Sequence, residues 1–226
     1  MLIRTRWLLA ATLGCLALVV AGCGSGSSSG GSHGMSGMRG MDQKPAAELS
    51  TAPSGTFKGE KLAGPHPRPS FTLTDTRGKR YDFGARTAGH PTLLYFGYTH
   101  CPDVCPTTMA DEAAALRLVP MNLRRETRVV FVTTDPKRDT PPVIGRWLSR
   151  FDGGLPEPFI GLTGTEAQVE AAQRLAGVTV AQDGGQTHSA QVLLYGPDNV
   201  ARVFFQQGNS PSDISHDLPV VAKQKG

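Results

Sequence analysis

Apolar and polar positions divide the chain into three parts. An almost unbroken apolar run occupies residues 7–21 and follows two arginines, Arg4 and Arg6. A polar stretch rich in glycine and serine follows, from residue 24 to about residue 63. Beyond it, short apolar runs alternate with segments whose apolar residues recur at helical spacing. Only this last part can bury a core, so we expect a single folded domain of roughly 160 residues at 64–226.

Strands and helices alternate in the predicted domain. Apolar and β-branched runs predict two central strands, at 92–97 and 129–134. Hairpins are expected where turn residues separate two short strands, and helices where apolar residues recur every three to four positions. The hairpins lie at 71–82 and 191–205, and the helices at 107–119, from Pro141, 165–175 and 211–222. This order predicts an α/β thioredoxin-like fold, with a central mixed sheet flanked by helices and an added N-terminal β-hairpin.

Two cysteines follow the first central strand. Cys101 and Cys105 lie in the run Tyr-Thr-His-Cys-Pro-Asp-Val-Cys-Pro at 98–106, and Pro106 opens a helical pattern. Both sulfurs should therefore lie at a helix N-terminus, where free N–H groups and the macrodipole stabilise thiolate. Thiolate attacks disulfides and binds soft metals. Three residues separate the cysteines, whereas a thioredoxin motif has two, and a purely structural disulfide would close too small a loop to stabilise the fold much.

His188 is the residue that we expect to join the two cysteines. It precedes an apolar strand, at the place where thioredoxins carry a cis-proline, and this favours metal binding over thiol exchange. Two thiolates and an imidazole suit Cu(I) and can also hold Cu(II). Such a three-ligand site stays partly open, as an exchangeable carrier requires, whereas closed four-ligand sites are structural.

The neighbouring polar residues have weaker claims to the site. We expect His100 to point away from it and Asp103 to be an exposed loop residue. Asp135 ends the second central strand at the same sheet edge, where it either orients the site from an outer shell or caps the next turn. Asp139 is expected to pair with Arg138 or to cap the helix that starts at Pro141.

Three motifs in this order resemble the SCO/SenC family over about residues 64–222. They are the cysteine run at 98–107, the segment Thr-Asp-Pro-Lys-Arg-Asp-Thr-Pro at 134–141, and Thr-His-Ser at 187–189. The resemblance implies a thioredoxin-like copper chaperone that helps assemble the binuclear copper centre of cytochrome c oxidase. It also implies that Cys101, Cys105 and His188 are the copper ligands, and that the oxidase's copper-bearing subunit, other copper carriers or thiol reductants are partners.

The first two parts of the chain predict export and anchoring. The basic start and apolar run indicate a signal peptide at 1–22. Val-Ala-Gly-Cys at 20–23 resembles the lipobox of bacterial lipoproteins, which implies a lipid on Cys23 and a place on the extracytoplasmic face of the bacterial cell membrane. Residues 23–63 are then a lipidated flexible linker. His33 and the methionines at 35, 38 and 41 are either low-complexity filler or a weak Cu(I) site.

Two functions remain open at this stage, and a third is weaker. The first is a metal chaperone for the oxidase. The second is an extracytoplasmic thiol–disulfide oxidoreductase, so whether the protein is an enzyme stays undecided. A peroxidase is disfavoured because the cysteines are so close together. The formal net charge is +4, and the sequence contains no basic cluster with interleaved aromatic residues. We therefore expect no nucleic-acid partner.

Overall fold

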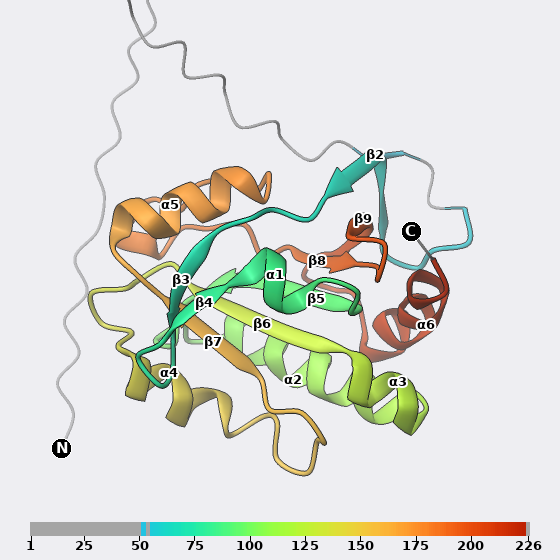
Figure 1. Cartoon of the computed structure of the whole chain (residues 1–226), viewed down its shortest axis with the longest axis horizontal. Coiled ribbons are helices and arrows are strands. Elements are labelled where there is room, and N and C mark those ends of the chain that lie inside the picture. Colours follow the sequence, from blue (N-terminus) through green and yellow to red (C-terminus); the bar gives the residue numbers. More distant parts are fainter. Residues whose placement is uncertain (1–50, 53–54, 225–226) are drawn as a thin grey trace, which may run out of the picture. The chain divides into compact units, whose positions relative to one another are not determined.

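The computed structural model describes residues 51–52 and 55–224, and in them strands of one sheet run in the order β1-β2-β9-β8-β5-β6-β7-β3-β4 (Figure 1). The strands are β1 (Thr51–Ala52), β2 (Glu60–Pro67), β3 (Thr72–Asp75), β4 (Arg80–Asp82), β5 (Thr92–Gly97), β6 (Arg128–Thr133), β7 (Ile160–Thr163), β8 (Val192–Tyr195) and β9 (Val200–Phe205). The helices are α1 (Phe83–Thr87), α2 (Val104–Leu118), α3 (Met121–Glu126), α4 (Pro141–Leu148), α5 (Glu166–Leu175) and α6 (Pro211–Ala222), with a short 3-10 turn at Asp183–Gly185.

Strands β5 and β6 form the centre of the sheet. They pair in parallel, and every residue of β5 is buried. Such continuous apolar runs are typical of strands covered on both faces. β8 joins β5 antiparallel and β9 joins β8, so the sheet is mixed, as the sequence predicts.

Helices cover both faces of the sheet (Figure 1). One core lies on the face covered by α2, α4 and α6, and includes Tyr95, Cys105 and Met109. The second core lies on the face covered by α1 and α5, and includes Phe83, Phe96 and Tyr195. Successive residues of β5 therefore alternate between the two cores, as the strand period requires.

The predicted elements are present, with shifts at their ends. The β3–β4 hairpin pairs as expected, and Thr165 caps α5 through its side chain. Helix α2 begins at Val104 and not at residue 107, which brings Cys105 into its first turn. The linker was predicted to reach residue 63, but β2 begins at Glu60 and Leu62 is buried. Residues just before β2 are also held, because the backbone N–H groups of Lys58 and Gly59 donate to the Asp217 carboxylate.

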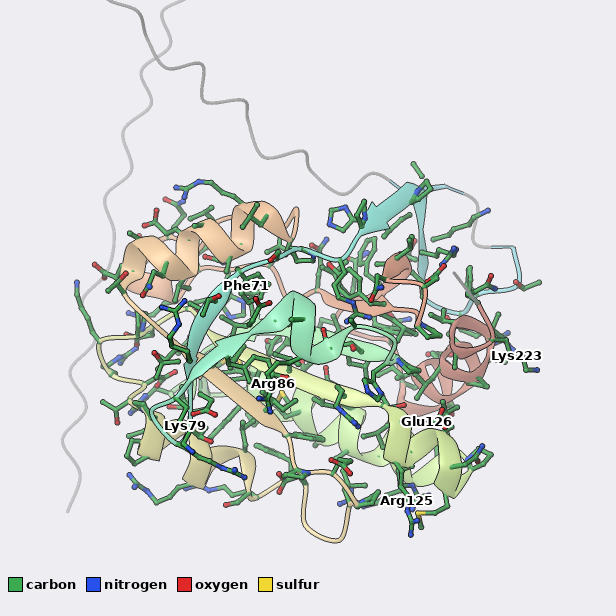
Figure 2. All side chains as sticks on the ribbon, in the orientation of Figure 1. Phe71, Lys79, Arg86, Arg125, Glu126 and Lys223 are labelled. Atoms are coloured by element: carbon green, nitrogen blue, oxygen red, sulfur yellow. The ribbon has the colours of Figure 1, made fainter. Side chains whose placement is uncertain are left out.

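Charged side chains project from the outside of the folded part. Figure 2 shows Lys79, Arg125 and Lys223 at the periphery, and all three are exposed. None of the helices in the described residues is long and apolar enough to cross a bilayer. The predicted signal, the lipobox at Cys23 and the His/Met cluster of the linker lie outside the described residues.

Candidate metal centre

A buried carboxylate holds the loop that carries the cysteines. Asp139 is fully buried and accepts hydrogen bonds from the Thr99 N–H at 2.8 Å, the Thr99 hydroxyl at 2.5 Å and the Thr133 hydroxyl at 2.6 Å. These bonds tie the end of β5 to the end of β6. The expectation that Asp139 pairs with Arg138 or caps α4 was wrong, because Arg138 bonds Asp135 and α4 has no side-chain cap.

The two cysteines occupy different environments. Cys101 lies in the loop and is half-buried, whereas Cys105 is fully buried in the first turn of α2. The N–H of Cys105 donates to the sulfur of Cys101 at 3.4 Å, so the helix N-terminus faces that sulfur, as the sequence predicts. Both are free thiols. Gly97 makes room for Cys105, because a Cβ on it would lie 2.9 Å from the Cys105 sulfur.

Burial and hydrogen bonding shift the pKa values of the two thiols in opposite directions. Desolvation raises the pKa of the Cys105 thiol to about 12. The hydrogen bond from Tyr95 lowers this pKa, but its effect is smaller than that of desolvation. Burial also acts to raise the pKa of Cys101, but N–H groups of Cys105 and Asp103 outweigh it and lower that pKa below its ordinary value. At neutral pH Cys101 is therefore the more nucleophilic thiol, while Cys105 keeps its proton until an ion or a disulfide displaces it.

His188 reaches the cysteines from the loop before β8. The loop is docked on the end of β6, where the Thr134 hydroxyl donates to the Gly185 carbonyl at 2.6 Å. Gly185 has φ +94°, and a Cβ there would clash with the Thr134 backbone. This close approach requires glycine, and it fixes the loop three residues before His188.

The imidazole of His188 presents one nitrogen to the sulfur. Its Nδ1 lies 3.0 Å from the Ser189 carbonyl, which can only accept, so Nδ1 carries the proton. Its Nε2 is then a lone-pair donor and lies 3.6 Å from the Cys105 sulfur. Desolvation lowers the pKa of His188, so the ring stays neutral and able to bind a metal at neutral pH.

Two tyrosines line the site beside His188. The ring of Tyr95 lies edge-on to the imidazole with centroids 6.1 Å apart, and that of Tyr98 with centroids 5.6 Å apart. An open depression of about 330 Å³ exposes Cys101 and His188 to solvent. The site is therefore walled on the core side and accessible from outside.

Among the described residues, the side chains of Asp135, His100 and Asp103 make no hydrogen bond to the ligand atoms. The Asp135 carboxylate is buried and pairs with Arg138. His100 is exposed and lies 3.3 Å from the Asp139 carboxylate, and Asp103 is exposed at the rim of the depression. The outer-shell role of Asp135 stays a prediction.

The donor set fits a soft metal ion. Two ligand atoms that each lie about 2.0–2.3 Å from one ion are roughly 3.5–4 Å apart, and the Cys105 sulfur and His188 Nε2 already have such a separation of 3.6 Å. Within residues 55–224, no three His, Cys, Asp or Glu side chains converge as a finished metal cage. The structure thus brings together two of the predicted ligands and places the third, Cys101, beside them.

Sequence reasoning missed Tyr95. Its hydroxyl donates to the Cys105 sulfur at 3.2 Å, inside the core. The sequence did contain a signal, a tyrosine within an apolar strand. A buried phenol hydroxyl needs a hydrogen-bond partner, so this tyrosine indicated a polar group inside the core.

The fold and this site define a class: thioredoxin-like proteins with a cysteine pair at a helix N-terminus and a facing histidine. The SCO1/SenC family model matches residues 60–223, and the chain belongs to the SCO1/SenC family.

Known proteins agree with this assignment. Protein SenC of Rhodobacter capsulatus is 34% identical over 134 residues, which cover 57% of this chain and 58% of SenC. An SCO2-like protein of Rickettsia felis is 33% identical over 156 residues, covering 66% of this chain and 73% of the relative. Against relatives from Stutzerimonas stutzeri and Rickettsia prowazekii, the chain spans only about half of their length, 55% and 48%.

Solved structures share the fold. The structure of Bradyrhizobium japonicum ScoI with copper bound has a TM-score of 0.57 and 32% identity, and the match covers 69% of this chain and 99% of ScoI. Apo Sco1 of Thermus thermophilus has a TM-score of 0.57 and 29% identity, covering 74% and 94% of the two chains.

Proposed function

We propose that this protein is a copper chaperone that binds one copper ion through Cys101, Cys105 and His188. The observation that carries the proposal is the 3.6 Å approach of the neutral His188 Nε2 to the Cys105 sulfur, beside an accessible Cys101. Thiolates and imidazole form a soft donor set that suits Cu(I) and also holds Cu(II). The copper-bound ScoI structure supports the choice of metal.

Each ligand would contribute differently to loading and release. Cys101, accessible and with a lowered pKa, would meet the ion first. Cys105 would lose its proton as the ion enters, since only thiolate binds the metal. His188 would complete the set without losing a proton. The depression over Cys101 and His188 would leave room for an incoming ligand from an acceptor protein.

We propose that the acceptor is the copper-bearing subunit of cytochrome c oxidase. Other copper carriers or thiol reductants would be further partners of this protein. Membership of the SCO1/SenC family supports this destination. A more distant fold relative, 22% identical, is described as a member of the Sco family of cytochrome c oxidase assembly proteins.

A second function rests on the asymmetry of the thiols. Cys101 is accessible with a lowered pKa, and Cys105 is buried with a raised one. The Cys101 thiolate could attack a disulfide on the acceptor, and Cys105 could then attack the mixed disulfide, which releases the reduced acceptor and leaves a Cys101–Cys105 disulfide. Thiol–disulfide exchange does not need His188, and copper binding does.

The replacement His188→Ala tests the leading function. Loss of a single outer-shell partner costs about 10–100-fold in metal affinity, so we expect loss of this ligand to weaken Cu(II) binding by more than about 100-fold. Both thiols should still titrate. The measurement is competition against a chelator of known affinity, followed by visible absorption.

His66→Ala is the matched control. His66 is also half-buried and bonded to a backbone carbonyl, that of Ala176, but it lies beside Tyr195 of the opposite core. This variant should bind copper as the wild type does. Wild-type affinity in His188→Ala would remove His188 from the ligand set and favour the thiol–disulfide function.

A further inference from the structure

Tyr95 contacts two of the three proposed ligands from inside the core. It lies on β5, is completely buried, and donates its hydroxyl proton to the Cys105 sulfur at 3.2 Å. The edge of its ring meets His188 at an interplanar angle of 71°. Tyr98 makes a comparable pair of contacts, with the Cys101 sulfur and the His188 ring, but it lines the open depression, whereas Tyr95 lies wholly inside the core.

Gly97 makes this contact possible. Tyr95 and Gly97 are two residues apart on β5 and therefore face the same core. A Cβ at Gly97 would lie 2.7 Å from the Tyr95 ring and 2.9 Å from the Cys105 sulfur. The missing side chain thus leaves a slot that the phenol and the sulfur share, and the strand and helix α2 hold the two groups against each other.

The hydrogen bond is shielded from water, because Tyr95 and Cys105 are both fully buried. Hydrogen bonds in a low-dielectric interior are stronger than those at a surface. Donation to a thiolate also draws electron density from sulfur, so the sulfur becomes a weaker donor to a bound ion. Hydrogen bonding around a cysteine sulfur is one of the features that set the reduction potential of a copper–thiolate centre.

We propose that Tyr95 is a positioning residue whose hydroxyl weakens electron donation from the Cys105 sulfur and so favours Cu(I) over Cu(II) at this site. This inference rests on the proposed copper function. One hydroxyl group on the core side would then set the relative affinity for Cu(I) and Cu(II). The open side of the site would stay free for exchange of copper with partners.

The test is Tyr95→Phe, which removes the hydroxyl and keeps the ring. Tyr195→Phe is the matched control: Tyr195 is equally buried in the same sheet, but on the opposite core, and its hydroxyl has no partner in the described residues. The readouts are Cu(I) and Cu(II) affinities, the copper reduction potential, and the energy of the sulfur-to-Cu(II) charge-transfer band.

We expect Tyr95→Phe to raise the ratio of Cu(II) affinity to Cu(I) affinity by about 10-fold, the lower end of the range for an outer-shell partner, because the sulfur becomes a stronger electron donor. The reduction potential should therefore drop, and the charge-transfer band should move to longer wavelength. Tyr195→Phe should match the wild type in every readout. An unchanged band and potential in Tyr95→Phe, or equal changes in the two variants, would overturn the inference while leaving the copper function intact.

A metal-free readout separates failure of the inference from failure of the proposed function. If the wild type binds no copper, the proposed copper function is wrong. The thiol–disulfide equilibrium of Cys101 and Cys105 in a glutathione buffer then tests whether the Tyr95 hydroxyl acts on the Cys105 sulfur. The hydrogen bond stabilises the reduced form, so Tyr95→Phe should shift the equilibrium about fivefold towards the disulfide. A shift no larger than that of Tyr195→Phe would show that the hydroxyl does not act on the sulfur.

Discussion

Cys101 and Cys105 differ because the loop before α2 leaves the Cys101 sulfur accessible, while the first turn of α2 points the Cys105 sulfur into the core. The accessible sulfur faces free N–H groups at the helix N-terminus, and the buried one faces Tyr95 and His188. Desolvation opposes ionisation, while hydrogen bonds to thiolate favour it. The net pKa shift is therefore downward for Cys101 and upward for Cys105, although both belong to one motif.

This difference predicts the order of alkylation. In the reduced, metal-free protein at pH 8, iodoacetamide should modify Cys101 first and Cys105 at least about tenfold more slowly, because only thiolate reacts. With a pKa of about 12, Cys105 is almost entirely protonated at that pH. Peptide mapping by mass spectrometry gives the two rates. Cys101→Ser and Cys105→Ser are the single-thiol controls, and equal rates in these variants would contradict the assignment.

At the residue scale, the sequence was sufficient for residues whose chemistry is rare. Two cysteines and one histidine stood out, and the structure brings His188 to Cys105 across 83 positions of sequence. It was not sufficient for Tyr95 or Asp139. Tyrosines and aspartates are common, and their roles here depend on which buried donor or acceptor lies opposite them, which no local pattern encodes.

Helix α2 carries a carboxyl group on its buried face. Glu112 lies seven residues after Cys105, two turns along the same face, and is completely buried. Both of its carboxyl oxygens lack a hydrogen-bond partner in the part of the chain that the structure describes. Desolvation, helped by the charge of Asp111, raises the pKa of Glu112 well above its ordinary value of 4.5, so the folded protein holds it neutral.

This predicts that stability falls as the pH rises. Above about pH 4.5 the unfolded chain releases the Glu112 proton and the folded chain keeps it, so the unfolding free energy drops by about 1.4 kcal/mol per pH unit until the folded pKa is reached. Glu112→Leu removes both the proton and the unpaired oxygens. We expect it to stabilise the domain, and by at least about 1.4 kcal/mol more at pH 8 than at pH 5.

Chemical denaturation at the two pH values measures this effect. Glu112→Gln is the control, because it keeps the shape and the unpaired polar atoms but cannot titrate. It should show the same pH-dependent gain relative to the wild type as Glu112→Leu, with a smaller constant gain. An equal stability difference at pH 5 and pH 8 would mean that Glu112 does not hold a proton in the folded state.

For the whole molecule, we propose an exported protein held at the extracytoplasmic face of the bacterial cell membrane by a lipid on Cys23. Acyl chains bind bilayers with about 0.8 kcal/mol per buried CH₂. We therefore expect Cys23→Ala to block maturation or to release the protein from the membrane fraction. Immunoblots of membrane and soluble fractions measure this, and Cys15→Ala is the control. A correctly cleaved Cys23→Ala protein that stays with the membrane would place the anchor elsewhere.

The sequence by itself determined the alternation of strands and helices, the mixed sheet and the location of the reactive thiols. These follow from periodicity, turn residues and proline, which act over a few neighbouring positions. Helix ends were less certain, because the start of α2 at Val104 depends on how the preceding loop is held.

Tertiary structure alone decided the environment of each thiol. Asp139 holds the cysteine loop, Gly97 admits Tyr95 beside Cys105, and Gly185 docks the loop of His188 on Thr134. The first and third of these contacts join residues 40 and 51 positions apart in the chain, and the second joins a strand to the helix that follows it. Burial and hydrogen bonding, which set pKa values and metal preference, depend on all the atoms around a group and are fixed only when those segments meet.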